Sequence, residues 1–400
     1  MPNRNDAAPG PCTGYRVIDF TTMVSGPVCT QVLGDLGADV LKVEAPPFGD
    51  PSRVTGSQER DGMSGYFAQL NRNKRSIVLD LRNDAAAEVA QRLVERADVV
   101  VQNFRPGVAE RLGIDYETLR QRAPALVYVA ITGFGPDGPY ADQPAYDHIL
   151  QGLTSMMPIQ GTPDDPRMMQ SVVVDKASGL AAASAAVAAL LARERTGQGQ
   201  RVDVPMLDAY SAYMLPEILG SNAYPDLPPG DASTSQQIFR TWETRDGHLV
   251  GIVVQDSQFE GFCRMVERED LLTDERFNQM ANRFANLPAF YELIEAELAK
   301  RSTAELVERA RRYQVPFGPV HDFEAFLADP QTLHNGTVTE VVEASGGRTR
   351  QLAHAARYGA TPASYRLDPP RLGEHTDVAL SEAGLTADEV AALRANGVVA

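Results

Sequence analysis

Residues 15–43 read YRVIDFTTMVSGPVCTQVLGDLGADVLKV, and this stretch decides the fold. Residues 15–20 and 38–43 carry short runs of valine, isoleucine, leucine and aromatic side chains, which predicts two strands. Gly26-Pro27 opens a predicted helix that continues to Asp35, because proline is favoured at the first helical position. A strand, a helix and a second strand in this order predict one unit of a parallel sheet.

The same alternation continues toward residue 132. Further strands are predicted at residues 76–81, 98–103 and 126–132, and helices at residues 85–96 and 116–122. Such alternation is typical of an α/β fold, in which helices cover a parallel sheet. The loop after the first strand lacks the G-x-G-x-x-G pattern, so we expect no nicotinamide cofactor.

A second region follows residues 221–235, which are rich in Pro, Gly, Asp and Ser and predict a linker. Apolar runs on both sides of Arg245-Asp246-Gly247 predict a β-hairpin at residues 238–254. Amphipathic helices come next, one of them opened by Ser302 with Glu305 as a capping box. The sequence therefore predicts a smaller α+β domain that ends near His321.

The composition limits the partners of the chain. A net charge of -16 over 400 residues argues against nucleic acid and anionic membranes, both of which require basic surface. The three cysteines include no C-x-x-C pair, so a reducing compartment, the cytoplasm, is expected. None of the six histidines lies at metal-ligand spacing from another histidine or cysteine, so no metal is expected. Residues 179–192 form the longest apolar stretch, too short for a membrane span, and residues 1–14 show no signal peptide.

Asp175 lies where a β-branched run, residues 172–174, meets an alanine-rich segment that begins at Gly179. This pattern predicts a strand followed by a helix, with Asp175 at the positive end of the helix, where its carboxylate remains ionised. Such a carboxylate can act as a nucleophile without a partner base. It can equally be a helix cap, because aspartate is a preferred N-cap residue. The residues alone leave both roles open.

Cationic side chains stand out against the acidic background in residues 71–75 and at Arg82, Arg105 and Arg111. Cations at the strand ends of an open α/β sheet suit a bound anion, although a solvated charged surface is the alternative. Residues 103–107, Asn-Phe-Arg-Pro-Gly, directly follow a predicted strand. They offer an amide, an aromatic face and a guanidinium in one turn, which suits a nucleotide.

Together these segments resemble the family III CoA-transferases. The resemblance covers nearly the whole chain in order, through residues 17–20, 26–27, 36–44, 49–50, 71–81, 103–107, 133–139, 196–200 and 373–377. That family includes formyl-CoA transferase, carnitine CoA-transferase and, as a branch, α-methylacyl-CoA racemase.

The resemblance implies a fold that the residues alone do not predict. The N- and C-terminal segments would build one Rossmann-like large domain with the smaller α+β domain inserted, and two subunits would interlock into a homodimer. The expected parts are a flexible tail at residues 1–14, the first part of the large domain at 15–205, a linker at 206–235, the small domain at 236–322, and the return linker with the end of the large domain at 323–400.

The resemblance also implies a chemistry, with coenzyme A as co-substrate. Asp175 would attack an acyl-CoA donor and pass CoA to a carboxylic acid acceptor through aspartyl anhydride and aspartyl-CoA thioester intermediates. By similarity, the residues that hold CoA would be Asn103, Phe104, Arg105 and Arg111, with Leu79 and Arg82 near the adenosine, and Val24, Ser25, Tyr146 and Asp147 at the thioester end.

The residue before Asp147 separates two activities within the family. The racemase branch has histidine there as a second base, whereas this chain has Tyr146, as in the transferases. His148 follows Asp147 and is expected to point elsewhere. Racemisation needs two bases, so we expect a transferase, with a racemase or epimerase and a non-catalytic acyl-CoA-binding protein as alternatives.

Two departures from formyl-CoA transferase concern the acyl group. That enzyme has glutamine at the position of Val24, and it has a run of glycines in the small domain that residues 251–261 lack. An apolar Val24 beside the small Ser25 predicts an acyl group that is larger or less polar than oxalate or formate.

Overall fold

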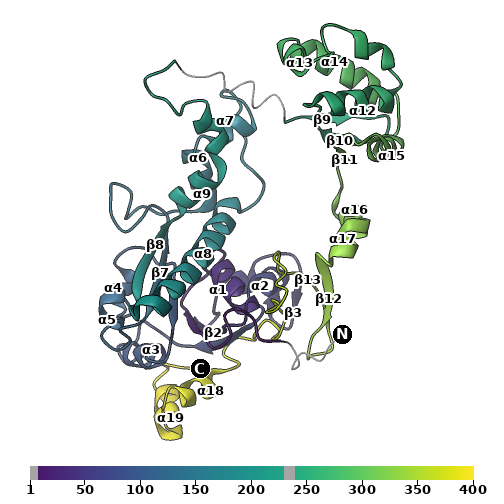
Figure 1. The fold of residues 1–400 in the computed structure, drawn as a ribbon. Coiled ribbons are helices and arrows are strands. Elements are labelled where there is room, and N and C mark those ends of the chain that lie inside the picture. The colour runs from purple at the N-terminus through teal and green to yellow at the C-terminus, as the bar shows by residue number, and fades with distance from the viewer. Residues whose placement is uncertain (1–7, 229–238) are drawn as a thin grey trace. The chain divides into compact units, whose positions relative to one another are not determined.

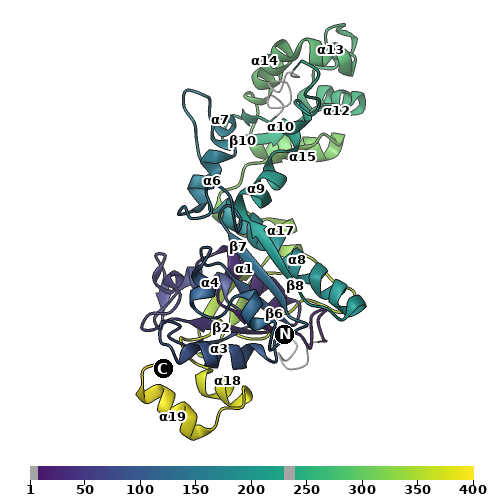
Figure 2. The same ribbon diagram turned by 90° about the vertical axis from the view of Figure 1, so that its left-hand side faces the viewer.

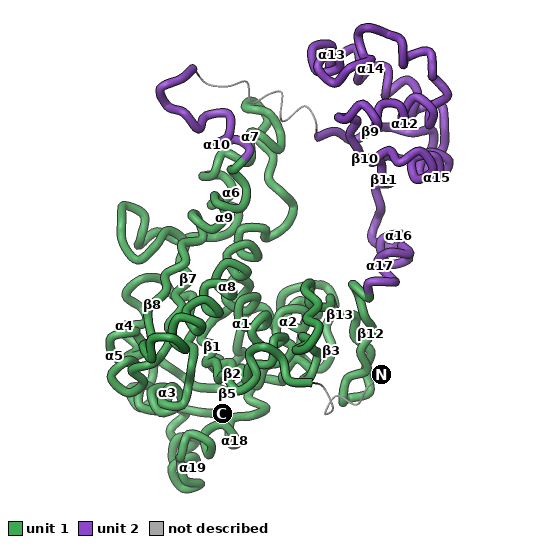
Figure 3. The backbone as a smooth tube through the Cα atoms, in the orientation of Figure 1, with its two compact units in different colours: residues 1–216, 336–400 green, residues 217–335 purple. Residues whose placement is uncertain are grey.

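The computed structural model describes residues 8–228 and 239–400. Two units can be recognised by their internal contacts (Figure 3): unit 1 comprises Met1–Pro216 and Gly336–Ala400, and unit 2 comprises Glu217–Asn335. Residues 1–7 of the expected tail, and 229–235 of the expected linker, lie outside the described residues, as does the start of the predicted hairpin at Ile238.

Unit 1 is built on a six-stranded sheet with the order β5-β2-β1-β6-β7-β8 (Figures 1 and 2). Every neighbouring pair in it is parallel. The strands are β1 Arg16–Asp19, β2 Asp39–Glu44, β5 Lys74–Val78, β6 Val99–Gln102, β7 Val127–Thr132 and β8 Gln200–Pro205. The predicted α/β class with a parallel sheet is confirmed. All residues of β6 and β7 are buried, as expected for strands covered on both faces.

Helices cover both faces, and successive strand residues alternate between two cores. Val17 and Val99 belong to the core under α1 (Ser25–Asp35) and α8 (Val173–Thr196). Ile18 and Val100 face the opposite core, which contains side chains of α3 (Ala86–Val94), α18 (Thr376–Glu382) and α19 (Ala387–Ala395). The C-terminal helices therefore complete the same layer as α3, although residues 95–375 lie between them in the sequence.

The remaining elements of unit 1 are short. They are the 3-10 helix Pro51–Val54, β3 Glu59–Arg60, β4 Met63–Ser64, α2 Gly65–Leu70, α4 Val108–Arg111, α5 Tyr116–Leu119, α6 Asp147–Leu153, α7 Met156–Gln160, α9 Met206–Met214, β12 Val338–Val342 and β13 Arg348–Leu352. Helix α9 lies inside the stretch assigned to the linker, where Met206 and Tyr210 are buried in the same core as α8. Before β1, Cys12 is also buried, and its N–H donates to the Leu36 carbonyl at 2.8 Å.

Unit 2 contains a three-stranded antiparallel sheet with the order β11-β10-β9. The predicted hairpin at Arg245-Asp246-Gly247 is confirmed, because His248 pairs with Glu243 across it. The elements are α10 Pro216–Gly220, β9 Thr241–Glu243, β10 His248–Gly251, α12 Asp256–Val266, the 3-10 helix Glu269–Thr273, α13 Met280–Ala285, α14 Leu287–Leu298, α15 Thr303–Tyr313, β11 Phe317–Pro319, α16 Phe323–Ala328 and α17 Pro330–Asn335.

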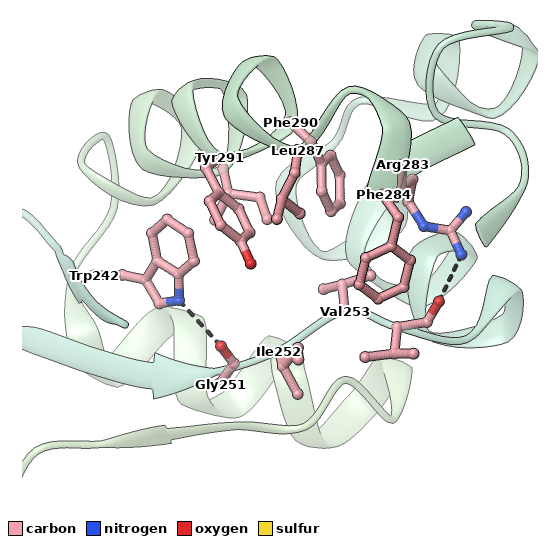
Figure 4. A pocket seen from close by; sticks show the side chains of 11 residues that line it. Trp242, Gly251, Ile252, Val253, Arg283, Phe284, Leu287, Phe290 and Tyr291 are labelled. Carbon is pink, nitrogen blue, oxygen red and sulfur yellow. Dashed lines mark hydrogen bonds between the residues drawn. The ribbon is translucent and has the colours of Figure 1, made fainter. Parts of the chain in front are cut away.

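The core of unit 2 is aromatic. Trp242 and Tyr291 meet edge to face, with ring centroids 5.3 Å apart, and the Trp242 Nε1–H donates to the Gly251 carbonyl at 3.1 Å (Figure 4). The cavity beside them has a volume of about 10 Å³, which is room for a single water molecule. It is therefore part of the packing of this core rather than a substrate pocket.

The strand predicted at residues 172–174 is wrong. Val172 is the N-cap residue of α8, and Val173 and Val174 form its first turn. Burial of Val174 in the core outweighs the intrinsic strand preference of valine. By length and composition, α8 is the one helix in the described ranges that could cross a membrane, and 44% of its most apolar 18-residue window is buried.

Helices α1 and α8 are in close contact at Gly179. A Cβ atom added there would lie 2.5 Å from the Ser25 carbonyl oxygen and 2.7 Å from Val28 Cβ. Both contacts are shorter than real carbon atoms tolerate, and one of them is with the backbone. Glycine at this position therefore sets the distance between the two helices.

Replacement of Gly179 by alanine should destabilise the protein. We expect Gly179→Ala to lower the free energy of unfolding by about 1–3 kcal/mol through overpacking, measured by urea denaturation. Gly152→Ala is the matched control, because an added Cβ there meets nothing closer than 3.7 Å. That control should be neutral or stabilising, since alanine is the better helix former. Equal effects of the two substitutions would show that α1 and α8 can move apart freely.

Candidate active site

Asp175 lies in the first turn of α8 and faces the first turn of α1. It is the third residue of α8, so it is not the capping residue, and its side chain is half-buried. The hydroxyl and the backbone N–H of Ser25 both act on this carboxylate as donors and lower the pKa of Asp175. Ser25 is the first residue of α1, and the N–H groups at a helix start have no partner within the helix. The N-terminus of α1 therefore holds the Asp175 carboxylate.

Asp147 fills the corresponding place at the start of α8. Its Oδ2 accepts hydrogen bonds from the N–H groups of Val174 at 2.6 Å and Asp175 at 3.1 Å. Its Oδ1 accepts a hydrogen bond from Gln151 Nε2 at 2.6 Å, and the residue is 6% exposed. Asp147 thus caps α8 from the separate helix α6, which removes the need for a capping residue on α8 itself.

The burial of the site raises the pKa of Asp175 to about 6. Desolvation is the largest cause, and the negative charge of Asp147 adds to it, while the hydrogen bonds from Ser25 act in the opposite direction. This pKa lies above the ordinary value of a carboxyl group, because desolvation outweighs the favourable helix N-terminus. At pH 7 the carboxylate is still about 90% ionised, since that pH is one unit above the pKa.

Asn103 fixes the loop that leads into α1. Its Oδ1 accepts from the Thr22 N–H at 3.0 Å, and its Nδ2 donates to the Thr22 carbonyl at 2.9 Å. The same Nδ2 lies 3.5 Å from the Ser25 hydroxyl. The structure thus brings Asn103, Ser25 and Asp175 into one connected group. Val24, the N-cap residue of α1, is 3% exposed, so its side chain is buried beside this group and does not line an open surface.

Two aromatic residues mark the outer side of Asp147. Tyr146 is 63% exposed, and its ring lies parallel to that of His148, with centroids 6.0 Å apart. His148 is exposed, whereas Asp147 between the two rings is buried, so the expectation that His148 points away from Asp147 stays a prediction. The backbone at Tyr146 is extended before α6 begins, which brings side chains two residues apart to one side.

Tyr66 is coupled electrostatically to Asp175 and Asp147, which the sequence did not reveal. The charges of Asp175 and Asp147 help to raise its pKa, after burial as the main cause, so its hydroxyl lies within their electrostatic reach. It comes from α2, and no local pattern connects α2 with α6 or α8. In the sequence Tyr66 lies shortly before the run Asn71–Arg75, and this position does not predict a relation to Asp175.

Phe104 and Arg105 line a separate pocket at the end of β6. Its volume is about 190 Å³, and its lining includes Tyr128, Thr132 and Arg201. Arg105 is exposed and Phe104 packs partly against the sheet, so both can contact a ligand. The sequence predicted the first two residues but not Arg201.

The other residues expected to hold CoA lie in different settings. Arg111 ends the short helix α4 and is exposed. Arg82 is also exposed, and its guanidinium pairs with the Asp80 carboxylate at 2.8 Å. Leu79 is completely buried and forms a backbone bridge to Val399, so its side chain is core rather than ligand surface. Within residues 8–228 and 239–400, no group of three His, Cys, Asp or Glu side chains could hold a metal ion.

Comparison with known proteins identifies the class. The model of CoA-transferase family III matches residues 13–376. A succinate–glutarate CoA-transferase from Agrobacterium fabrum is 35% identical, over 96% of this chain and 97% of its own. A formyl-CoA:oxalate CoA-transferase from Escherichia coli is 30% identical, over 97% and 99%. The crystal structure of a CaiB/BaiF family protein from Brucella suis superposes with a TM-score of 0.82 at 32% identity, covering 94% and 100%.

The chain therefore belongs to CoA-transferase family III, and the predicted resemblance is confirmed. It is an enzyme that transfers CoA between acids, and acyl-CoA is its co-substrate.

The raised pKa of Asp175 has a consequence for stability. Above pH 6 the folded protein bears the full cost of the buried carboxylate, and below about pH 4 the group is protonated in both states. We expect Asp175→Asn to raise the free energy of unfolding by about 1–3 kcal/mol at pH 8 and to leave it nearly unchanged at pH 4. Urea denaturation at both pH values measures this. The exposed control Asp165→Asn should show no such gain at either pH.

Proposed function

We propose that Asp175 is the nucleophile that carries CoA from an acyl-CoA donor to a carboxylic acid acceptor. The observation that supports this most is the placement of its carboxylate at the start of α1, held by the hydroxyl and N–H of Ser25. A nucleophile must be ionised, fixed in direction and only partly solvated, and Asp175 meets all three conditions at neutral pH.

The exchange consists of two symmetrical halves. The Asp175 carboxylate attacks the donor thioester carbonyl, which forms a mixed anhydride and releases CoA thiolate. The thiolate attacks the aspartyl carbonyl of the anhydride, which gives an aspartyl-CoA thioester and frees the donor acid. The acceptor carboxylate attacks this thioester to form a second anhydride and release the thiolate. The thiolate then takes the acceptor acyl group and restores the Asp175 carboxylate, so the energy of the thioester is conserved.

The electrostatics of the site favour the first step. Acylation removes the negative charge of Asp175, which ends its repulsion with Asp147 and the cost of its burial. The same two effects raise its pKa, so the ground-state carboxylate is less stable than one in water. The N–H groups at the start of α1 are suitable donors for the negative charge that develops on each carbonyl oxygen.

CoA recognition is assigned to the loop after β6 and to neighbouring cations. Phe104 and Arg105 would hold the nucleotide at the 190 Å³ pocket, with Arg111 and Arg82 as further cations for its phosphates. Asn103 would act chiefly by holding Thr22 and Ser25 in place. Leu79 would support the adenosine only through its backbone, because its side chain is buried.

We assign the acyl groups to short dicarboxylic acids larger than oxalate. The Agrobacterium relative is named for succinate and glutarate, which supports this assignment. All three cysteines are free and buried, which suits a reducing compartment, the cytoplasm. Tyr146 and Asp147 would then border the thioester end of the site.

Covalent labelling tests the role of Asp175. After incubation with succinyl-CoA, we expect the wild-type protein to gain the mass of CoA less one water, whereas Asp175→Ala gains nothing. Asp175 is the only carboxylate between Arg167 and Lys176, so one tryptic peptide assigns the adduct without ambiguity. Asp165→Asn is the matched control and should keep the adduct. An adduct of equal amount on Asp175→Ala would overturn the proposal.

The same experiment in heavy water decides between transferase and racemase. The ring of His148 beside Tyr146 is the one observation that favours a second base near the site. Uptake of deuterium at the α-carbon of a 2-methylacyl-CoA, with no adduct on Asp175, would assign the protein to the racemase branch. Binding of CoA without either reaction would assign it to the non-catalytic alternative.

We also propose that two copies interlock into a homodimer. On the described part of α8, the side chains of Leu180, Val187 and Leu191 are exposed, at 57%, 39% and 52%. Their spacing places them on one side of the helix, opposite the face buried in the core. An exposed apolar stripe of this kind is typical of an interface between subunits.

An interlocked dimer should not exchange its subunits under native conditions. We expect two differently tagged batches of the protein, mixed and incubated for a day, to give no mixed dimer in a pull-down. The same batches, unfolded and refolded together, should give mixed dimers, because the chains must open to interlock. Rapid exchange without denaturant would show an ordinary surface dimer, and a mass of 43.4 kDa in light scattering would show a monomer.

A further inference from the structure

A buried ion pair lies beneath the loop that leads to Ser25. Lys42 Nζ and Asp50 Oδ2 are 2.9 Å apart, and both side chains are completely buried. Lys42 comes from β2, and Asp50 precedes the 3-10 helix Pro51–Val54. The free energy lost when two charged groups leave water is about as large as the free energy gained from their attraction. A contribution to stability therefore does not explain such a pair.

Each partner also holds one backbone group of the loop. Lys42 Nζ donates to the Thr21 carbonyl at 2.8 Å, and Asp50 Oδ1 accepts from the Met23 N–H at 3.1 Å. Asp50 is itself oriented by Ser52, whose N–H and hydroxyl donate to it at 2.9 and 2.7 Å. The pair therefore forms hydrogen bonds with the residues on both sides of Thr22, and Asn103 forms hydrogen bonds with Thr22 itself.

Met23 is strained at the point where the pair holds it. Its φ angle is +66°, in the left-handed region that non-glycine residues rarely adopt. The direction of the chain at Met23 determines where α1 starts, two residues later at Ser25. Strain of this kind persists only where the surrounding contacts impose it.

We propose that the Lys42–Asp50 pair is a positioning device of the active site. By holding the Thr21 carbonyl and the Met23 N–H, it keeps Met23 in the left-handed conformation and so keeps the Ser25 N–H on the Asp175 carboxylate. Neither residue touches the reacting groups, so both act through the loop. The inference rests on the proposed function in one respect, the role of Asp175 as nucleophile.

The test removes both charges together. In Lys42→Met with Asp50→Asn, no unpaired charge remains in the interior. We expect the kcat of CoA transfer to fall about tenfold, as misplacement of a catalytic group does, with the KM for acyl-CoA changed by no more than about twofold. The matched control is Asp35→Asn with Arg72→Met. The side chains of that pair are also buried, at 6% and 4% exposure with a separation of 2.5 Å, and their described hydrogen bonds do not reach residues 19–25.

A rescue distinguishes positioning from stability. Glycine adopts positive φ angles without strain, so Met23→Gly in the neutral-pair background should restore several-fold of the lost kcat. The same substitution in the Asp35→Asn and Arg72→Met background should restore nothing. A purely structural role of Lys42 and Asp50 would show equal loss in both backgrounds and no rescue in either, which would overturn the proposal.

A second readout does not depend on turnover. Carbodiimide labels protonated carboxyl groups, so the pH midpoint of labelling at Asp175 reports its protonation. Misplacement of Ser25 should raise this midpoint, because its hydrogen bonds lower the pKa, while Asp147 and Tyr66, the other groups that face Asp175, stay unchanged. An unmoved midpoint would overturn the inference. Absence of the CoA adduct in the wild-type protein would instead overturn the proposed function and leave this readout valid.

Discussion

The contact between the first turns of α1 and α8 is the constraint on which the site depends. Gly179 lets the two helices approach until Ser25 and Asp175 meet. Each helix start carries N–H groups that need acceptors, and each receives a carboxylate from outside its own first residues. Asp175 serves α1, and Asp147 serves α8. One arrangement thus satisfies two helix termini and fixes the Asp175 carboxylate.

This arrangement destabilises the ionised form of Asp175, which makes its carboxylate more reactive. Two carboxylates lie close together in a partly desolvated place, and the pKa of Asp175 rises to about 6 as a result. A solvated pair of aspartates would be more stable but less reactive. The buried charges of Lys42 and Asp50 beneath the loop also lower stability locally, because they hold Met23 in a strained conformation. The stability lost here is offset by the two large cores on either side of the sheet.

Most of the sheet was predictable from the sequence, because parallel strands buried on both faces read as continuous apolar runs. Residues 99–102 and 127–132 are of this kind. The edge strand β8 was missed, because its valines alternate with exposed polar side chains and form no continuous apolar run. The strand predicted before Asp175 failed because burial of Val174 overrides local preference.

The candidate site was predictable only as far as its motifs reach. Asp175 and Asn103 were candidates from their local sequence, and Ser25 and Asp147 came from the resemblance, but none of the contacts that connect them was predicted. Asp147 caps a helix that begins 26 positions later, and Asn103 holds a loop that lies 81 positions earlier. No local pattern records such pairs, because they depend on which strands become neighbours. Tyr66 was missed for the same reason.

The edge of the sheet at β5 has a consequence for how the protein is made. Asn73 and Ser76 receive their partners from Leu367 and His375, and Leu79 pairs with Val399. Until these distant residues have been synthesised, the unpaired N–H and C=O groups of β5 can form hydrogen bonds with a strand of another chain. Unit 2, by contrast, is one uninterrupted stretch and can fold first. Synthesis therefore leaves unit 1 exposed to misassembly for longer than unit 2.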